Sequence, residues 1–182
     1  MSVIETEHLH LRPFTPADAE AYYAAILADA RVMEFLPGGK PTPPQRAPAI
    51  VRGMIEHWED FGYGLWAVID KASGELIGHC GLQQLDNKDD IELAYALARG
   101  FWRRGLATEA AQATVRYGFE MLNLPKIVAV VVPENKASQA VLRKIGMKFE
   151  RRARVYQDIL PLYSIEQGTY QPDAAFQYQL SD

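Results

Sequence analysis

The sequence predicts a single α+β domain in which a mixed, mostly antiparallel sheet carries helices on both faces. The chain has 182 residues, a length that suits one domain with a sizeable core. Strand-like runs follow one another through the middle of the chain, and a strand–helix–strand unit comes after them. Such an order combines antiparallel and parallel pairing in one sheet. We therefore expect one domain over residues 1–182, with its core over about residues 8–166.

The first half of the chain is expected to contribute three strands and two helices. Leu9 and Leu11 alternate with polar residues, as in a strand with one buried face. Thr15 is a good N-cap, Pro16 suits the first helical position, and Asp18 can answer the cap from three residues on. The expected elements are a strand over 7–13, a helix over 15–30, a loop over 37–44, a helix over about 45–60, and strands over 64–70 and 75–85.

The second half is expected to extend the sheet and to add two helices. Small side chains recur at helical spacing from Gly105 onward, and Pro125 ends that helix. The run KIVAVVV is apolar and β-branched, as in a strand buried on both faces. The short helix that follows is expected to stop at Gly146. The expected elements are a polar turn over 86–90, a strand over 91–97, a helix from 105 to about 122, a strand over 126–132, a helix within 133–147, and strands over about 148–157 and 159–166, interrupted by Pro161.

Composition and charge exclude several classes of protein. The formal net charge is −4, so the chain as a whole offers no field that favours nucleic acid. Cys80 is the only cysteine, which excludes an intrachain disulfide and a cysteine-rich zinc site, and the four histidines lack a metal-ligand spacing. The N-terminus lacks the apolar core of a signal peptide, and no apolar run approaches the roughly 20 residues that span a bilayer. We expect a cytoplasmic protein without a metal, a membrane partner or a DNA partner.

The segment GFWRRGLATEA, residues 100–110, joins a strand to a helix through a glycine. A helix N-terminus presents unpaired backbone N–H groups and a partial positive charge, which together suit a phosphate group. Arg103 and Arg104 would add charge-assisted contacts, and the small residues after Gly105 would let a pyrophosphate approach the backbone. Neither a P-loop nor a G-x-G-x-x-G motif is present. By spacing alone, an anion site and an ordinary turn fit this segment equally well.

The wider order of motifs is more specific. IELAYAL, FWRRGLATEA, VAVVV and PENKASQAVLRKIGM follow one another as in the GCN5-related N-acetyltransferase (GNAT) superfamily, and the chain most resembles its branch of ribosomal-protein N-terminal acetyltransferases. The family's pyrophosphate loop is written [QR]-x-x-G-x-[GA]. Gly105 and Ala107 match it, whereas Trp102 departs from its first position. The resemblance runs from about residue 8 to about residue 165.

This resemblance implies an enzyme that uses acetyl-coenzyme A. In the family fold two parallel strands, here 91–97 and 126–132, splay into a V that receives the pantetheine arm. The residues that would bind that arm through their main chain are Ala94, Tyr95, Ala96 and Leu97. The residues that would hold the pyrophosphate are Arg103, Arg104, Gly105, Leu106, Ala107 and Thr108. Asn135 matches an asparagine that touches the cofactor on its far side, and Ser138 follows it in the same motif.

Acetyl transfer to an amine requires an uncharged nitrogen. Alkylamines have a pKa near 10.4 and α-amino groups one of about 8, so a general base matters more for a side-chain amine than for a protein N-terminus. Glu92, on the strand that would line the cleft, is the candidate base, directly or through a water chain, and a solvated or ion-paired strand residue is its alternative. The resemblance makes Ser138 the candidate proton donor to the departing thiolate, because many relatives carry a tyrosine there.

Four other polar features have structural interpretations. A lone cysteine in a strand, here Cys80, is more often buried and inert than an acyl carrier. His79 is a base by its ordinary pKa, but the sequence does not determine which face of the sheet carries it. Tyr163 matches a recurrent tyrosine for which packing is the expected role. The run ERRAR, residues 150–154, fits a solvated strand edge better than a contact to the 3′-phosphate of the cofactor.

The acceptor is an amine of a protein N-terminus or of a small molecule, and the sequence leaves this choice open. Two alternative functions are a catalytically inactive acyl-coenzyme A-binding or sensor protein of the same fold and, less favoured, a DNA-binding module that uses SQAVLRKIG as a recognition helix. The net charge and the lack of a preceding helix at the right spacing disfavour the DNA-binding module. A homodimer is also left open.

Overall fold

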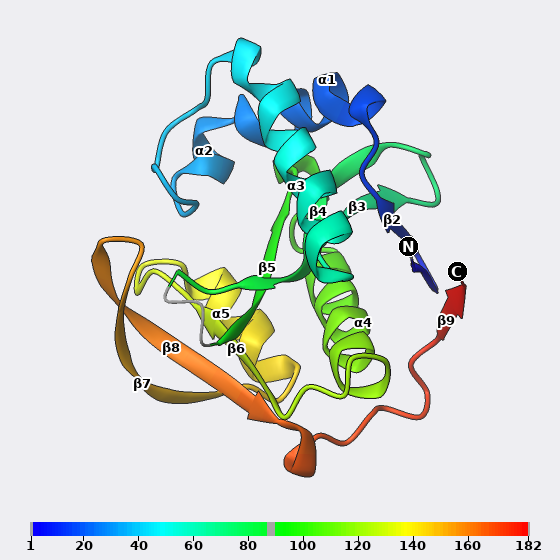
Figure 1. The fold of residues 1–182 in the computed structure, drawn as a ribbon, viewed down its shortest axis with the longest axis vertical. Helices are drawn as coiled ribbons and strands as arrows, with labels where there is room; N and C mark the ends of the chain where they lie inside the picture. Colours follow the sequence, from blue (N-terminus) through cyan, green and yellow to red (C-terminus); the bar gives the residue numbers. More distant parts are fainter. Residues whose placement is uncertain (1, 87–89, 182) are drawn as a thin grey trace.

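Figure 1 shows the fold in the computed structural model, which describes residues 2–86 and 90–181. The nine strands form one sheet in the order β7-β8-β6-β5-β4-β3-β2-β1-β9. The strands are β1 (Val3–Thr6), β2 (Leu9–Pro13), β3 (Leu65–Asp70), β4 (Leu76–Gln84), β5 (Ile91–Leu97), β6 (Lys126–Val130), β7 (Lys148–Val155), β8 (Asp158–Glu166) and β9 (Tyr178–Ser181). The α-helices are α1 (Ala19–Tyr22), α2 (Ala30–Met33), α3 (Ala47–Phe61), α4 (Leu106–Glu120) and α5 (Lys136–Lys144). The middle of the expected polar turn over 86–90 lies outside the described residues.

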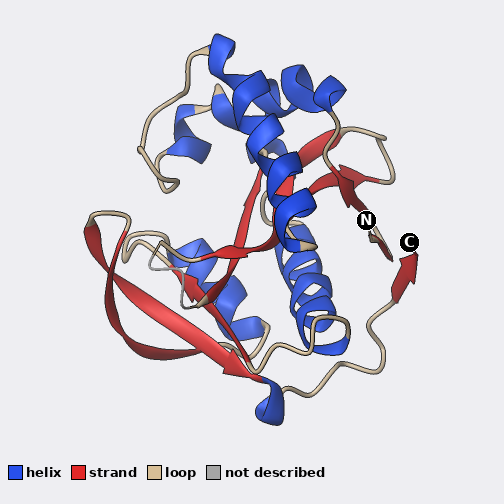
Figure 2. Ribbon diagram, viewed as in Figure 1, coloured by secondary structure: helices blue, strands red, loops and turns tan. Residues whose placement is uncertain are grey.

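Helices lie on both faces of the sheet, so the predicted α+β fold is confirmed (Figure 2). On one face, α1, α2 and α3 pack against small side chains of the sheet, such as Ala67 and Ala96. On the other face, α4 and α5 bury Leu82, Leu93 and Ile127 of the central strands. Alternation along each strand sends successive side chains to these two opposite layers.

The strands β5 and β6 are the only parallel pair among those described, as the strand–helix–strand unit predicts. Their pairing holds at one position, Glu92 opposite Val128. Beyond that position the two strands separate, as Figure 1 shows, while β5 stays paired with β4 and β6 with β8. The sheet therefore opens into a V at its centre.

The N-terminal region differs from the prediction in two ways. The strand expected over 7–13 is β2, and an unexpected strand β1 precedes it and pairs with it. The helix expected over 15–30 begins as predicted, since both the N–H and the hydroxyl of Thr15 donate to the carboxylate of Asp18. It ends early, because Asp29 leaves the helical conformation and caps α2 through the N–H of Arg31. Between α1 and that end, residues 23–27 form a π-helical turn.

Pro161 does not interrupt β8, contrary to expectation. The strand runs from Asp158 to Glu166, and the carbonyl of Pro161 accepts from the N–H of Val131. A residue's N–H and C=O point to the same side of its strand, so the missing N–H faces the point where β6 has already ended. The regular β6–β8 ladder therefore ends one pair earlier, at Val130 and Leu162.

The segment after β8 lies outside the predicted core over residues 8–166, and no element was predicted in it. It crosses α4, where the ring of Tyr170 lies 4.9 Å from that of Phe119, and ends in β9, which pairs with β1. The two ends of the described chain therefore lie side by side at one edge of the sheet (Figure 1). Within residues 2–86 and 90–181, no helix is both long and apolar enough to cross a bilayer.

Candidate active site

The loop between β5 and α4 ends at a glycine whose backbone conformation is rare for any other residue. Gly105 is the N-cap of α4 and has φ 82°, in the left-handed region that favours glycine. A Cβ built on it meets no atom within 4 Å, so the space beside its Cα is open. The backbone N–H groups of the first helical turn, at Leu106, Ala107 and Thr108, have no acceptor within the helix, because the first intrahelical bond runs from the N–H of Glu109 to the carbonyl of Gly105. This arrangement suits an anion.

Trp102, the departure from the family motif, holds this loop against the sheet. Its indole N–H donates to the carbonyl of Leu97 at 2.7 Å, at the end of β5. Leu97 was predicted to meet the pantetheine arm through its main chain, and its carbonyl has this internal donor in the structure. The carbonyl of Ala96 lies against β4, since a Cβ on Gly78 would stand 2.0 Å from its oxygen.

The two arginines of the loop take different positions. Arg103 is exposed and has φ 61°, an uncommon value for a residue with a side chain. Arg104 lies with its guanidinium 4.9 Å from the ring centre of Phe101 and 3.7 Å from the carboxylate of Asp70 on β3. Arg104 is therefore directed back over the sheet, half-exposed at the rim of the loop.

Glu109 attaches the start of α4 to the N-terminal strands, a role that the sequence pattern does not predict. Its carboxylate accepts from the Thr6 hydroxyl at 2.6 Å, from the His8 N–H at 2.8 Å and from the His8 imidazole at 2.9 Å. The hydrogen bond to Glu109 raises the pKa of His8. An acidic residue in a first helical turn was the available signal, but its partners lie about a hundred residues earlier.

Tyr95 and Ser138 meet on the α4–α5 face of the V. The phenol oxygen of Tyr95 lies 2.8 Å from the hydroxyl of Ser138, and both side chains are half-buried. The carboxamide oxygen of Asn135 accepts from the N–H of Ser138 at 3.0 Å and so caps α5. Burial raises the pKa of Tyr95, which keeps its phenol protonated at neutral pH. The side chain of Tyr95 was not among the predicted groups, which named only its main chain.

Glu92 lies on the opposite face and is 5% exposed. Its carboxylate accepts from the phenol of Tyr156 at 2.6 Å, from the amide of Gln83 at 3.0 Å and from the backbone N–H of Val130. Burial raises the pKa of Glu92, and these three hydrogen bonds act in the other direction. The alternative of a solvated or ion-paired residue does not hold, because Glu92 is buried and its partners are uncharged.

The V is thus flanked by a carboxylate on one face and by a pair of hydroxyls on the other. Glu92 and Tyr95 are separated by an odd number of positions along β5, so their side chains project to opposite layers. Glu92 belongs with Val128 and Val130 on the side of the β7–β8 turn, whereas Tyr95 packs with the core beneath α4 and α5. A group that entered between the strands would meet a proton acceptor on one side and proton donors on the other.

The other polar candidates are structural. Cys80 is buried, its sulfur lies 3.2 Å from the Thr114 hydroxyl, and burial raises its pKa to about 12. His79 is buried against Tyr22, with 2.9 Å between its Nδ1 and the phenol, and burial lowers its pKa to about 4. Tyr163 packs against Phe149 with 6.0 Å between the ring centres.

Two further sequence hypotheses concern the outer parts of the fold. The run 150–154 belongs to β7, the outermost strand, where Arg151 pairs with Asp90 at 3.3 Å, as expected of a solvated edge. The helix α5 follows the strand β6, so the element before it is not the first helix of a helix-turn-helix motif.

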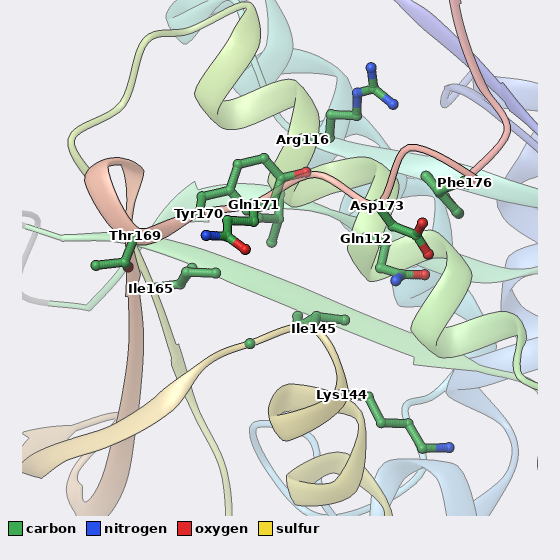
Figure 3. A pocket seen from close by; sticks show the side chains of 12 residues that line it. Gln112, Arg116, Lys144, Ile145, Ile165, Thr169, Tyr170, Gln171, Asp173 and Phe176 are labelled. Carbon is green, nitrogen blue, oxygen red and sulfur yellow. The ribbon is translucent and has the colours of Figure 1, made fainter.

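A hollow of about 330 Å³ lies away from the start of α4 (Figure 3). It separates the middle of α4 and the end of α5 from the C-terminal segment, and its lining includes Gln112, Arg116, Lys144, Thr169, Tyr170 and Phe176. None of the predicted site residues lines it.

Comparison with known proteins identifies a family match. Residues 8–148 match the family model described as acetyltransferase (GNAT) domain. The uncharacterized N-acetyltransferase p20 of Bacillus licheniformis is 32% identical over 162 residues, which cover 86% of this chain and 88% of p20. The crystal structure of a GNAT-family acetyltransferase from Bacillus anthracis has a TM-score of 0.78 at 26% identity, over 91% of this chain and 99% of that chain. The ribosomal-protein-S5-alanine acetyltransferase from Vibrio fischeri has a TM-score of 0.76 at 20% identity, over 93% and 99%, a likeness of fold alone.

Proposed function

The chain belongs to the GNAT family of acetyltransferases, and from this premise we propose that it moves an acetyl group from acetyl-coenzyme A directly to a primary amine within a ternary complex. The observation that carries the proposal is the V between β5 and β6, with the N-terminus of α4 after the end of β5, a buried carboxylate on one face and a pair of hydroxyls on the other. An inactive sensor would have no need of such groups.

The residues around the V fit acetyl-coenzyme A. Gly105 leaves the N-terminus of α4 open, and the N–H groups of the first turn offer donors to a pyrophosphate. Arg103 and Arg104 add positive charge at the same loop, and the main chain of Ala94 and Tyr95 offers partners to the pantetheine arm. The bound thioester would supply an acyl carbon that an uncharged amine can attack.

Two side chains of the protein would accept and donate the protons of the reaction. Glu92 would accept a proton from the amine nitrogen as the new C–N bond forms, because burial gives this carboxylate a raised pKa and hence a greater affinity for a proton. Ser138, with Tyr95 behind it, would donate a proton to the sulfur as the C–S bond breaks. The products are an amide and coenzyme A as its thiol, so one proton leaves the amine and one reaches the sulfur.

The acceptor is proposed as a class, a primary amine of a protein N-terminus or of a small molecule. A net charge of −4 favours a basic acceptor of either kind. Release of thiol from acetyl-coenzyme A, measured over a panel of alkylamines, amino acids and N-terminal peptides, separates the two kinds. Binding of acetyl-coenzyme A without thiol release from any amine would favour the sensor alternative.

The cofactor assignment is tested at Gly105. Glutamate there would place a negative side chain in the open space before α4, so Gly105→Glu should abolish acetyl-coenzyme A binding in isothermal titration while the fold stays intact. Gly105→Gln is the matched control, because it carries the same backbone strain and nearly the same volume without the charge. We expect the glutamine variant to bind at least about tenfold more tightly than the glutamate variant. Affinity equal to the wild type in the glutamate variant would reject the loop assignment.

A further inference from the structure

The turn between β7 and β8 has an unusual backbone. Val155 pairs with Asp158, so Tyr156 and Gln157 form a two-residue hairpin turn, and both have positive φ, 50° and 67°. Turns of this kind favour asparagine and glycine, because side chains at positive φ are strained. A tyrosine in such a position costs stability, and strain of this kind is kept where other contacts impose it.

Two contacts hold Tyr156 in this position. Its backbone N–H donates to the carboxylate of Asp86 at 2.9 Å, which ties the turn to the end of β4. Its phenol donates to the carboxylate of Glu92 at 2.6 Å, and the amide of Gln83 lies 3.3 Å from the same phenol oxygen. The strained backbone thus serves to bring one hydroxyl onto one buried carboxylate.

Tyr156 also borders a hollow that Glu92 does not line. This hollow of about 320 Å³ opens beside the turn, and its lining residues are His57, Gln83, Gln84, Leu85, Asp86 and Tyr156. Glu92 itself does not line this hollow but is reached from it through Tyr156 and Gln83, which contact both. An acceptor that entered from this side would meet Tyr156 before the carboxylate.

We infer that Tyr156 is a positioning residue for Glu92, which fixes the orientation of the carboxylate and keeps it ionised until the acceptor amine arrives. This inference rests on the proposed function, in which Glu92 takes the amine proton. A merely structural tyrosine would need its ring to complete the hairpin, whereas the inferred role needs the hydroxyl. The two roles are therefore separated by a variant that keeps the ring.

The titratable groups described around Glu92 give the sign of the effect. The pKa of Glu92 is raised by its burial and also by the negative charge of nearby Asp86. His57 lines the hollow, and burial lowers its pKa. Tyr156 donates a hydrogen bond to the Glu92 carboxylate. A donated hydrogen bond stabilises the ionised carboxylate and lowers its pKa. Removal of the Tyr156 hydroxyl should therefore raise the pKa of Glu92 further, so that the carboxylate stays protonated, and unable to act as a base, to a higher pH.

The test is Tyr156→Phe, with Tyr170→Phe as the control that removes a hydroxyl far from the V. In Tyr156→Phe the acid limb of kcat/KM against pH should move upward by about one pH unit, which lowers kcat/KM by up to about tenfold at pH values below the limb. Tyr170→Phe should leave the profile unchanged. In a Glu92→Gln background, Tyr156→Phe should cause little further loss, because its effect acts through the carboxylate.

A second readout does not depend on turnover. The pKa of Glu92, followed by the carbon-13 resonance of its carboxyl group, should be higher in Tyr156→Phe than in the wild type, and unchanged in Tyr170→Phe. An unchanged Glu92 titration, or an equal loss in the presence and absence of the Glu92 carboxylate, would overturn the inference. If the wild type releases no thiol with any amine, the proposed function fails, and the carboxyl titration still decides whether Tyr156 controls Glu92.

Discussion

The hydroxyl of Ser138 is within hydrogen-bond distance of the phenol of Tyr95, and the substitution of either residue removes this contact. The two oxygens lie 2.8 Å apart, and Asn135 fixes the backbone of Ser138 from the other side. A serine hydroxyl is a weaker acid than a tyrosine phenol. The structure supplies a phenol from β5, within hydrogen-bond distance of the serine.

We expect Ser138→Ala to lower kcat at least about tenfold while the dissociation constant of acetyl-coenzyme A changes less than about threefold. Steady-state kinetics and titration calorimetry measure the two quantities. Tyr95→Phe should lower kcat in the same direction, and the double variant should be no worse than Ser138→Ala, because the two hydroxyls act as one unit. Independent, multiplying effects would show that the phenol does not act through Ser138.

Residues of the site differ in how far the sequence could predict them. Asn135 and Ser138 stand in a continuous motif, so a resemblance to a family is enough to propose them, and Glu92 is the carboxylate on the strand expected to line the cleft. Tyr156 contacts Glu92 across 64 positions of the chain, and no motif joins the two. The contact between the Tyr156 phenol and Glu92 depends on the conformation of the hairpin turn, which only the folded backbone defines.

At the scale of elements, the entry into the first helix is held by one buried carboxylate. Asp18 accepts two hydrogen bonds from the guanidinium of Arg12, at 2.7 and 2.8 Å, and two from Thr15. Burial acts to raise the pKa of Asp18, but the hydrogen bonds from Arg12 and Thr15 prevail and hold it below its ordinary value. The cluster therefore joins β2 to the helical layer that contains α1, α2 and α3.

Asp18→Asn should lower the free energy of unfolding by roughly 2 kcal/mol at pH 7, the worth of hydrogen bonds to a charged group. Because the folded pKa of Asp18 is lowered, its contribution is present above the unfolded pKa of about 4 and is lost as the pH falls through the folded value. Urea unfolding at pH 7 and at pH 3 should show the difference from the wild type shrinking at the lower pH. Glu20→Gln, an exposed change in the same segment, should have little effect at either pH.

Elements were predictable where they are long and periodic. The helix α4 and the strands β3 to β6 agree with the expected ranges because their apolar patterns repeat several times. The strands β1 and β9 have four residues each, too few for a pattern to repeat. They are strands because each supplies the other with a hydrogen-bonding partner, and that condition involves both ends of the chain.

At the scale of the whole molecule, the C-terminal segment covers surfaces that the rest of the fold leaves open. Tyr178 and Leu180 pack on the core beneath α4, and the guanidinium of Arg116 lies 4.8 Å from the ring centre of Tyr178. The pairing of β9 with β1 also satisfies the outer backbone groups of β1 and leaves β9 as the edge strand. The segment therefore contributes both to burial and to backbone hydrogen bonding.

Deletion of residues 171–182 should lower the free energy of unfolding by roughly 2–4 kcal/mol, the cost of uncovering one or two large side chains. It should also increase self-association in light scattering, because the apolar surface that Tyr178 and Leu180 cover becomes exposed. Leu180→Asp should reproduce much of the destabilisation, whereas Gln179→Asp, on the exposed side of the same strand, should not. Equal effects of the two aspartates would argue against burial as the cause.

The pairing of β1 with β9 also has a consequence for the order in which the fold is completed. Val3 is opposite Ser181, so β1 is synthesised long before β9, its outer partner. Until β9 is available, the outer backbone groups of β1 have no partner within the sheet. Closing this contact joins the two most widely separated strands of the described chain, which makes it slow to form. The hydrogen bonds between β1 and β9 are therefore expected to be among the last of the sheet to form.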